Sequence, residues 1–195
     1  MAITINGSTN TISGLAVGGL PDGVVDTDMI ASSVSRITEV DQWYLTTDHN
    51  TNQANLTAWS RYLESGRSAA SPHGTGMSHA SGTFTFPSTG KYLIYLVANY
   101  SILNNDNVQV QIRVTEDNST YVAYSTALDG QVTSSGSQSR SGSGTAFAFV
   151  DVTNTAQVKV QFFAESIASG TNIKSSVNQN GMAMTTALFI RIGDT

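Results

Sequence analysis

Hydrophobic and polar residues alternate with a period of two along most of the chain after Thr38. Such alternation is typical of β-strands, because successive side chains of a strand point to opposite faces. No long helical pattern competes with it, so we expect an all-β, antiparallel jelly-roll sandwich of about eight to ten strands. The predicted strands cover residues 42–47, 82–87, 91–103, 108–115, 121–128, 145–152, 156–167 and 182–192.

The strand expected at Lys91–Leu103 has apolar side chains on both faces. We therefore place it in the centre of a sheet, covered on each side. Two tryptophans, Trp43 and Trp59, are expected to pack at strand ends, with a sugar-binding surface as the alternative. The phenylalanines that alternate with small or polar residues are expected in the core: Phe84, Phe86, Phe147, Phe149 and Phe162.

Three segments between the predicted strands are rich in Ser, Asn and Gly, namely Asn104–Asn107, Asp129–Gly144 and Ser169–Gln179. They are expected to be turns and loops. Loops held on a rigid scaffold carry most recognition, so any contact with a partner is expected there. The candidate receptor-facing residues are Asn104, Asn105, Asp106, Asn107 and Arg140.

Residues 1–36 differ from the rest of the chain, since they combine Gly, Ser, Thr and Asp with short apolar islands. One alternative is a disordered tail. The other is an arm that becomes ordered against identical copies or another protein, with a short helix over Asp26–Ile37. The sequence thus divides into an arm, 1–36, and a knob, 37–195. The candidate anchoring residues of the arm are Ile3, Ile5, Ile12, Leu15, Val17, Leu20, Met29, Ile30 and Val34.

Composition narrows the function classes further. The chain has 195 residues, a net charge of −5 and no cysteine. Neither a disulfide scaffold, a thiolate metal site nor a cysteine nucleophile is compatible with that composition. No basic patch favours nucleic acid or an anionic membrane, and no long apolar run predicts insertion into a membrane. We also see no targeting segment at the N-terminus.

Candidate chemistry is sparse. Three histidines, His49, His73 and His79, are expected in loops or at the surface, with a metal site on a threefold axis as the remote alternative. A group of aspartates, Asp22, Asp26 and Asp28, lacks the spacing of a calcium loop. Motifs for a serine nucleophile, a zinc protease or a phosphate loop are absent. We expect no catalytic, metal or cofactor site. The carboxylates Glu64, Glu116 and Glu165 are taken as solvated charges.

The stretch Gly82–Tyr100, GTFTFPSTGKYLIYLVANY, resembles the second and third strands of the C1q/TNF-like jelly roll. The closing strand, Thr186–Ile192, is similar to that family's C-terminal core strand. The resemblance covers about residues 38–192 and implies a ten-strand jelly roll that assembles as a homotrimer. Its signature core positions are Phe84, Phe86, Pro87, Gly90, Tyr92, Leu188 and Phe189.

The arm segment Ile3–Ser32 and the following Val40–Thr46 are similar to segments of C1q-like knobs in structural proteins of tailed bacteriophages, particularly aquatic ones. This resemblance implies a non-enzymatic virion protein, made in the host cytoplasm and released by lysis. One expectation is a short tail fibre or receptor-binding component that contacts a host surface glycan. The alternative is a capsid decoration or head-fibre protein. Its expected partners are copies of itself and a tail, baseplate or major capsid protein. An enzyme acting on host polysaccharide is a third hypothesis.

Overall fold

The computed structural model describes residues 4–6, 8, 11–13, 37–61, 72–103, 105–131, 139–177 and 182–195. Within these residues there are only strands, turns and extended segments, and no helix. The chain divides into two units, Met1–Arg36 and Ile37–Thr195. The prediction of an all-β antiparallel architecture is confirmed.

In the first unit, β1 (Thr4–Asn6) pairs antiparallel with β2 (Thr11–Ser13), and Ile5 lies opposite Ile12. The anchoring role of these residues stays a prediction. The short helix expected over Asp26–Ile37 lies outside the described residues up to Arg36, and Ile37 itself is exposed and belongs to no helix or strand. The remaining arm residues also lie outside the described part: Ile3, Leu15, Val17, Leu20, Met29, Ile30 and Val34.

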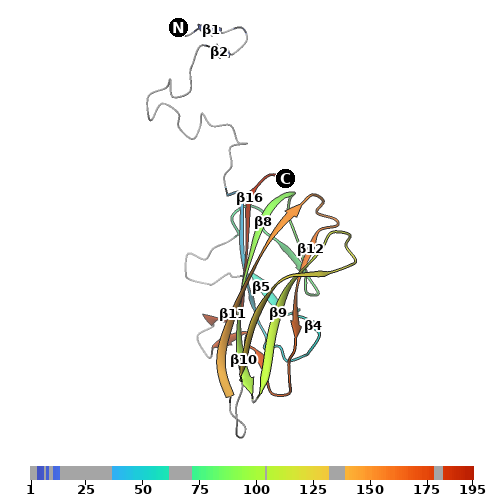
Figure 1. Cartoon of the computed structure of the whole chain (residues 1–195). Coiled ribbons are helices and arrows are strands. Elements are labelled where there is room, and N and C mark those ends of the chain that lie inside the picture. Colours follow the sequence, from blue (N-terminus) through green and yellow to red (C-terminus); the bar gives the residue numbers. More distant parts are fainter. Residues whose placement is uncertain are drawn as a thin grey trace. The chain divides into compact units, whose positions relative to one another are not determined.

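In the second unit, two antiparallel sheets pack face to face (Figure 1). The first, called the β8 sheet here, has the strand order β11-β8-β16-β3-β5, and β13 pairs with β8. Its strands are β3 (Glu39–Leu45), β5 (Trp59–Arg61), β8 (Gly90–Leu103), β11 (Ser139–Val152), β13 (Asn172–Ile173) and β16 (Thr186–Gly193).

The second sheet, called the β9 sheet here, has the order β10-β9-β12-β7-β6, and β4 pairs with β12. Neighbours in both sheets are mostly distant in sequence, as a jelly roll requires. A separate small pair is formed by β14 (Ser176–Val177) and β15 (Met182–Ala183). The strands of the β9 sheet are β4 (Ala54–Asn55), β6 (Ser78–Ala80), β7 (Thr83–Thr85), β9 (Asp106–Thr115), β10 (Val122–Gln131) and β12 (Lys159–Glu165).

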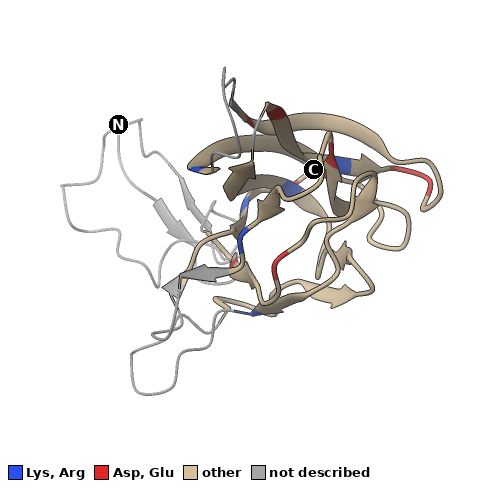
Figure 2. Ribbon diagram, turned by 90° about the horizontal axis from the view of Figure 1, so that it is seen from below, with Lys and Arg blue, Asp and Glu red and all other residues tan. Residues whose placement is uncertain are grey.

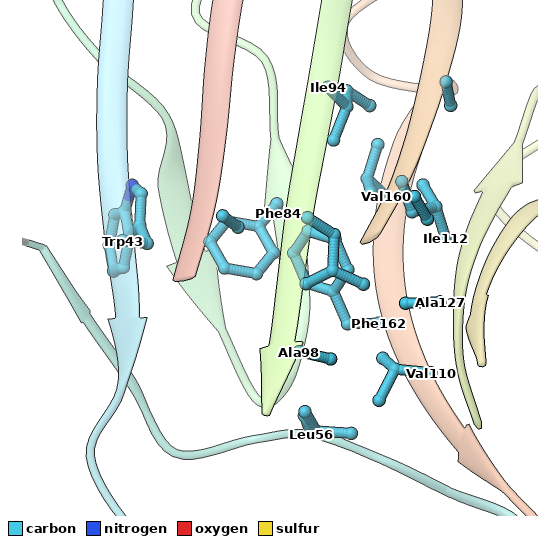
Figure 3. Close-up of a cluster of buried hydrophobic side chains, with 14 of the residues drawn as sticks. Trp43, Leu56, Phe84, Ile94, Ala98, Val110, Ile112, Ala127, Val160 and Phe162 are labelled. Atoms are coloured by element: carbon cyan, nitrogen blue, oxygen red, sulfur yellow. The ribbon is translucent and has the colours of Figure 1, made fainter. Parts of the chain in front are cut away.

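Aromatic side chains from both sheets meet in the space between them (Figure 3). Phe84 is fully buried, and its ring lies 5.2 Å from that of Trp43, 5.4 Å from that of Phe162 and 5.1 Å from that of Phe189, between ring centroids. Trp59 belongs to the same cluster, so the two tryptophans are core residues and form no sugar-binding surface. Edge-on and tilted ring packing of this kind stabilises the sandwich beyond simple burial.

The prediction that Leu188 is a core residue is wrong. Most members of the set are buried, whereas Pro87 and Leu188 are only half-buried; the buried members are Phe84, Phe86, Gly90, Tyr92 and Phe189. Its neighbours in β16, Ala187 and Phe189, point into the core, so alternation turns Leu188 to the outer face.

The turn between β7 and β8 explains why position 90 is a glycine. Gly90 has a φ of +139°, and a Cβ there would lie 2.7 Å from the carbonyl oxygen of Gly193. Only glycine fits that combination of backbone conformation and close approach. The hydroxyl of Tyr92 donates a hydrogen bond to the Ser88 carbonyl oxygen (3.1 Å) and so ties the turn to β8.

The expected loop at Asp129–Gly144 is much shorter than predicted. Its first residues belong to β10, and β11 already begins at Ser139, so Arg140 lies in a strand. The polar sequence did not predict this strand. The hydrogen bonds between neighbouring strands join backbone N–H and C=O groups, so they form with polar side chains as well as with apolar ones. Glycine is required here by close packing: a Cβ on Gly144 would lie 2.7 Å from the backbone nitrogen of Leu128 in β10.

We therefore expect Gly144→Ala to lower the free energy of unfolding by about 1–3 kcal/mol, because the added methyl group pushes β10 away from β11. Gly193→Ala is the matched control, since a Cβ at Gly193 has nothing within 4 Å. Urea unfolding of both variants measures the difference. Equal stability of the two variants would show that β10 does not approach β11 at this point.

Candidate functional site

The outer face of the β9 sheet is polar and its side chains bond to one another. Gln111 donates a hydrogen bond to Glu165, and Arg113 Nε donates to Gln111 Oε1 (2.8 Å). The Arg113 guanidinium also covers the ring of Phe163, 3.4 Å from the ring centroid. This part of the surface suits solvent, since its charged and amide groups are hydrogen-bonded and the ring of Phe163 is covered. On the neighbouring strand β10, Leu128 and Tyr124 are 56% and 45% exposed.

The outer face of the β8 sheet is apolar. Phe147 and Phe149 of β11 are 67% and 52% exposed, and Tyr95 of β8 is 40% exposed. In the ladder, Phe147 pairs with Tyr95 and Phe149 with Leu93. Across β8, the same register continues into β16, with Leu188 beside Tyr95 and Ile190 beside Leu93. The apolar face is defined as Leu93, Tyr95, Val97, Phe147, Phe149, Leu188 and Ile190.

The placement of Phe147 and Phe149 corrects the prediction that both are core residues. Their neighbours Ala146, Ala148 and Val150 point inward and are buried. Small residues are needed on the inner side because β10 lies against β11 there, as Gly144 shows. The large rings of β11 are thereby left on the outer face.

The apolar face also changes the expectation for β8. We expected this strand to be covered on both faces, but within the described chain only its inner face is buried. Exposed apolar side chains that adjoin one another in this way are typical of contact surfaces.

A polar hollow of about 450 Å³ lies where the β8–β9 turn, the segment after β12 and the turn before β4 meet. Asp106 accepts a hydrogen bond from the backbone N–H of Ala168 (3.0 Å), and Asn52 Oδ1 accepts one from Ile167 N–H (3.1 Å). These two bonds hold the three segments together. The hollow is lined by Asn52, Asn105, Asp106, Asn107, Ser166, Ile167 and Ala168.

The structure brings together three of the five candidate receptor-facing residues, Asn105, Asp106 and Asn107. Asn104 lies outside the described residues. Arg140 does not line the hollow: it forms an ion pair with Asp129 and donates to the Gly130 carbonyl oxygen (2.8 Å).

The sequence interpretation missed Asn52 and Ser166, which line the same hollow from other segments. Asn52 stands in a short run of polar residues, Asp48–Gln53, that resembles the loops we singled out. Ser166 lies at the end of a strand that was expected to continue to Ile167. No sequence signal indicates that these two segments meet the β8–β9 turn, because only the pairing of distant strands brings them there.

The β8–β9 turn, which lines the hollow, and the start of β3 lie at opposite ends of the sandwich (Figure 1). Glu39, close to the first residue of the second unit, pairs with Arg191, and Lys91 at the start of β8 pairs with Gly193. Leu103, at the other end of β8, precedes the turn that lines the hollow. A strand of this length separates its ends by about 40 Å.

The histidines do not gather into a site. His73 forms a β-bridge with Val40, His49 forms one with Ile173, and the ring of His79 packs at a tilt against that of Phe84, with 4.6 Å between ring centroids. Among the described residues, no three His, Asp or Glu side chains come together in a way that would hold a metal ion. The predicted residues Asp22, Asp26, Asp28 and Glu64 lie outside the described part, and Glu116 accepts a hydrogen bond from Tyr124 (3.0 Å).

His79 makes the stability of the sandwich depend on pH. Its Nε2 accepts a hydrogen bond from Gly82 N–H (3.1 Å), which requires a neutral ring, and burial lowers the pKa of His79 below 6.5. The unfolded chain then binds a proton that the folded chain does not, so stability is complete above pH 6.5 and falls as the pH drops below it. We expect His79→Phe to reduce this slope. Urea unfolding at about pH 7.5 and about pH 5.5 measures it.

The slope that remains in His79→Phe is assigned to His49, whose pKa burial also lowers. A slope that is the same in the wild-type protein and in His79→Phe would contradict protonation of His79 as its source.

In the part of the chain that the structure describes, no helix is long and apolar enough to cross a membrane. Figure 2, which shows the ribbon from below, has the acidic and basic residues of the described part spread over several strands and turns.

Comparison with known proteins supports the fold. No family model matches the chain, and no curated protein matches it. Among solved structures, an Eiger TNF from S. frugiperda is similar over 82% of this chain and 96% of its own, with a TM-score of 0.60 and 12% identity. Murine APRIL, crystallised at pH 5.0, is similar over 79% of this chain and 98% of its own, with a TM-score of 0.57 and 10% identity. The expected TNF-like jelly roll is thereby confirmed.

Proposed function

We propose that the chain is a non-enzymatic binding module that assembles with copies of itself into a trimeric knob. The observation that carries this proposal is the apolar face of the β8 sheet, in which Phe147, Phe149 and Tyr95 are exposed beside half-buried aliphatic residues. A second copy of the chain covers that face. The number of three copies rests on the resemblance to C1q/TNF-like knobs and on the TNF-like fold.

The knob belongs to a virion, as a short tail fibre or another receptor-binding component that contacts the host surface. This part of the proposal rests on the resemblance of Ile3–Ser32 to phage segments. The arrangement of the sandwich supports it. The chain enters at the end that contains Glu39, and the polar hollow lies at the opposite end. A knob held at the first end presents the hollow outward. The protein is made in the host cytoplasm and reaches the medium by lysis.

The test is to locate the chain on virus particles with an antibody raised against the full chain, using immunogold labelling. Label on the tail or baseplate is the expected result. Label spread over the capsid shell would overturn the receptor-binding role and favour the decoration protein, and particles without label would overturn the virion assignment.

Deletion of residues 1–36 extends this test to the arm. The expected product is a folded knob that no longer joins particles. Incorporation of the deletion variant at the wild-type level would contradict an anchoring role for the arm.

A further inference from the structure

The backbone around the polar hollow has an unusual conformation. Ser166, in its wall, has a φ of +58°, and Gln53, next to Asn52, has a φ of +53°. Residues other than glycine rarely adopt this conformation, and where they do it is often at a binding or catalytic site. Among the described residues, four that are not glycine have a positive φ. Two of them, Ser166 and Gln53, are at this hollow, and the other two are Ser81 and Asn118.

The side chains of the hollow offer both donors and acceptors. Asn52 uses its oxygen on Ile167 N–H, which leaves its amide N–H groups as donors. Ser166 Oγ accepts from Gln109 Nε2 (3.4 Å), so its hydroxyl hydrogen is a further donor. Asp106 uses one oxygen on Ala168 N–H and keeps the other as an acceptor. Asn107, which is exposed, has no side-chain hydrogen bond to any described residue.

This set of groups suits hydroxyl groups of a ligand. Each sugar hydroxyl both donates and accepts, and amide, carboxylate and hydroxyl side chains meet both needs at once. Ile167 and Ala168 add an apolar strip for the C–H groups of a sugar ring. A volume of about 450 Å³ lies within the range of small-ligand sites.

Charge restricts the ligand further. Among the described residues that line the hollow there is no lysine or arginine, and Asp106 is the one ionisable residue. An anionic sugar would bring a second negative charge beside that carboxylate, with no cation to offset it. Arg140, the basic residue among the candidate receptor-facing residues, is paired with Asp129.

We propose that this hollow binds a neutral saccharide, recognised through its hydroxyl groups by Asn52, Asp106, Asn107 and Ser166. The inference rests on the proposed contact with the host surface and names its site and ligand class. The hollow lies at the end of the sandwich opposite the entry of the chain, where a host glycan has access to it.

The test is saturation-transfer difference NMR of the full chain with glucose, galactose, mannose, rhamnose, fucose and N-acetylglucosamine. N-acetylneuraminic acid and glucuronic acid serve as anionic probes, and each experiment is repeated with EDTA. At least one neutral sugar is expected to give a signal that EDTA leaves unchanged. Asn107→Ala and Ser166→Gly are each expected to raise its Kd roughly five- to tenfold.

Asn118→Gly is the matched control for Ser166→Gly. Both variants place glycine at a positive φ, but Asn118 lies in the turn after β9, at the other end of the sandwich. The control is expected to bind the sugar as the wild-type protein does. Absence of signal from every neutral sugar, a stronger signal from the anionic probes, loss of signal with EDTA, or equal effects of the two glycine variants would each overturn the inference.

Failure of this site is distinguishable from failure of the proposed function. If trimers label host cells and Asn107→Ala and Ser166→Gly trimers label them equally well, the saccharide site is wrong and the receptor-binding role stands. If the chain binds a neutral sugar through this hollow but is absent from virions, the saccharide site stands and the virion role is wrong.

Discussion

Replacing both exposed phenylalanines of β11, Phe147→Ser together with Phe149→Ser, should convert the assembled protein into folded monomers. The two rings are 67% and 52% exposed in one chain, and they are the most exposed side chains of the apolar face. Burying a phenylalanine contributes about 1.5–3 kcal/mol, so the double variant loses about 3–6 kcal/mol of association free energy for each protomer. That corresponds to a dissociation constant at least about a hundredfold higher. Analytical ultracentrifugation at micromolar concentration measures the change.

The control for this variant is Phe163→Ser, on the outer face of the β9 sheet. Phe163 lies under the Arg113 guanidinium on a polar surface, so its loss should leave the assembly intact. Circular dichroism should show the β-sheet spectrum for both variants, because Phe147 and Phe149 contribute little to the inner core. The double variant sedimenting like the wild-type protein, or Phe163→Ser dissociating it equally, would contradict the assignment of the interface.

Phe84→Ala should lower the free energy of unfolding by about 3–5 kcal/mol, the cost typical of a phenylalanine deleted from a packed core. Phe84 is fully buried and touches rings from both sheets: Trp43 and Phe189 in one, Phe162 in the other. Its removal leaves a cavity that neither sheet can close, since backbone ladders hold both in place. Urea unfolding is the measurement, made in the Phe147→Ser, Phe149→Ser background so that association does not contribute.

Phe84→Leu is the matched variant, because it keeps most of the apolar volume. It should cost clearly less than Phe84→Ala. If Phe84→Ala changed stability by less than about 1 kcal/mol, the ring would not be at the centre of the core as Figure 3 shows it.

The sequence predicted the fold well where one face of a strand is apolar and the other polar. In β9, Val108, Val110 and Ile112 alternate with glutamines, so the pattern alone identifies the inner face. It failed in β11, where Phe147 and Phe149 alternate with alanines that are apolar too. Period-two alternation cannot decide between two apolar faces, and the outcome depends on how closely β10 approaches.

The start of β11 shows a second limit. Ser139–Gly144 has the composition of a loop, yet it pairs residue by residue with the end of β8, Gly142 opposite Tyr100 and Gly144 opposite Ala98. The hydrogen bonds that pair this strand with β8 join backbone groups and involve no side chain, so the amino-acid composition does not predict them. Three residues of the polar hollow were predicted as a turn, but Asn52 and Ser166 join them only through the arrangement of strands.

The mass of the assembled protein in solution tests the central claim most directly, that the apolar face is covered by copies of the same chain. The chain has a mass of 20.6 kDa. Sedimentation equilibrium of the full chain at micromolar concentration is expected to give three times that mass. A mass equal to one chain, with Phe147, Phe149 and Tyr95 exposed to solvent, would contradict the account.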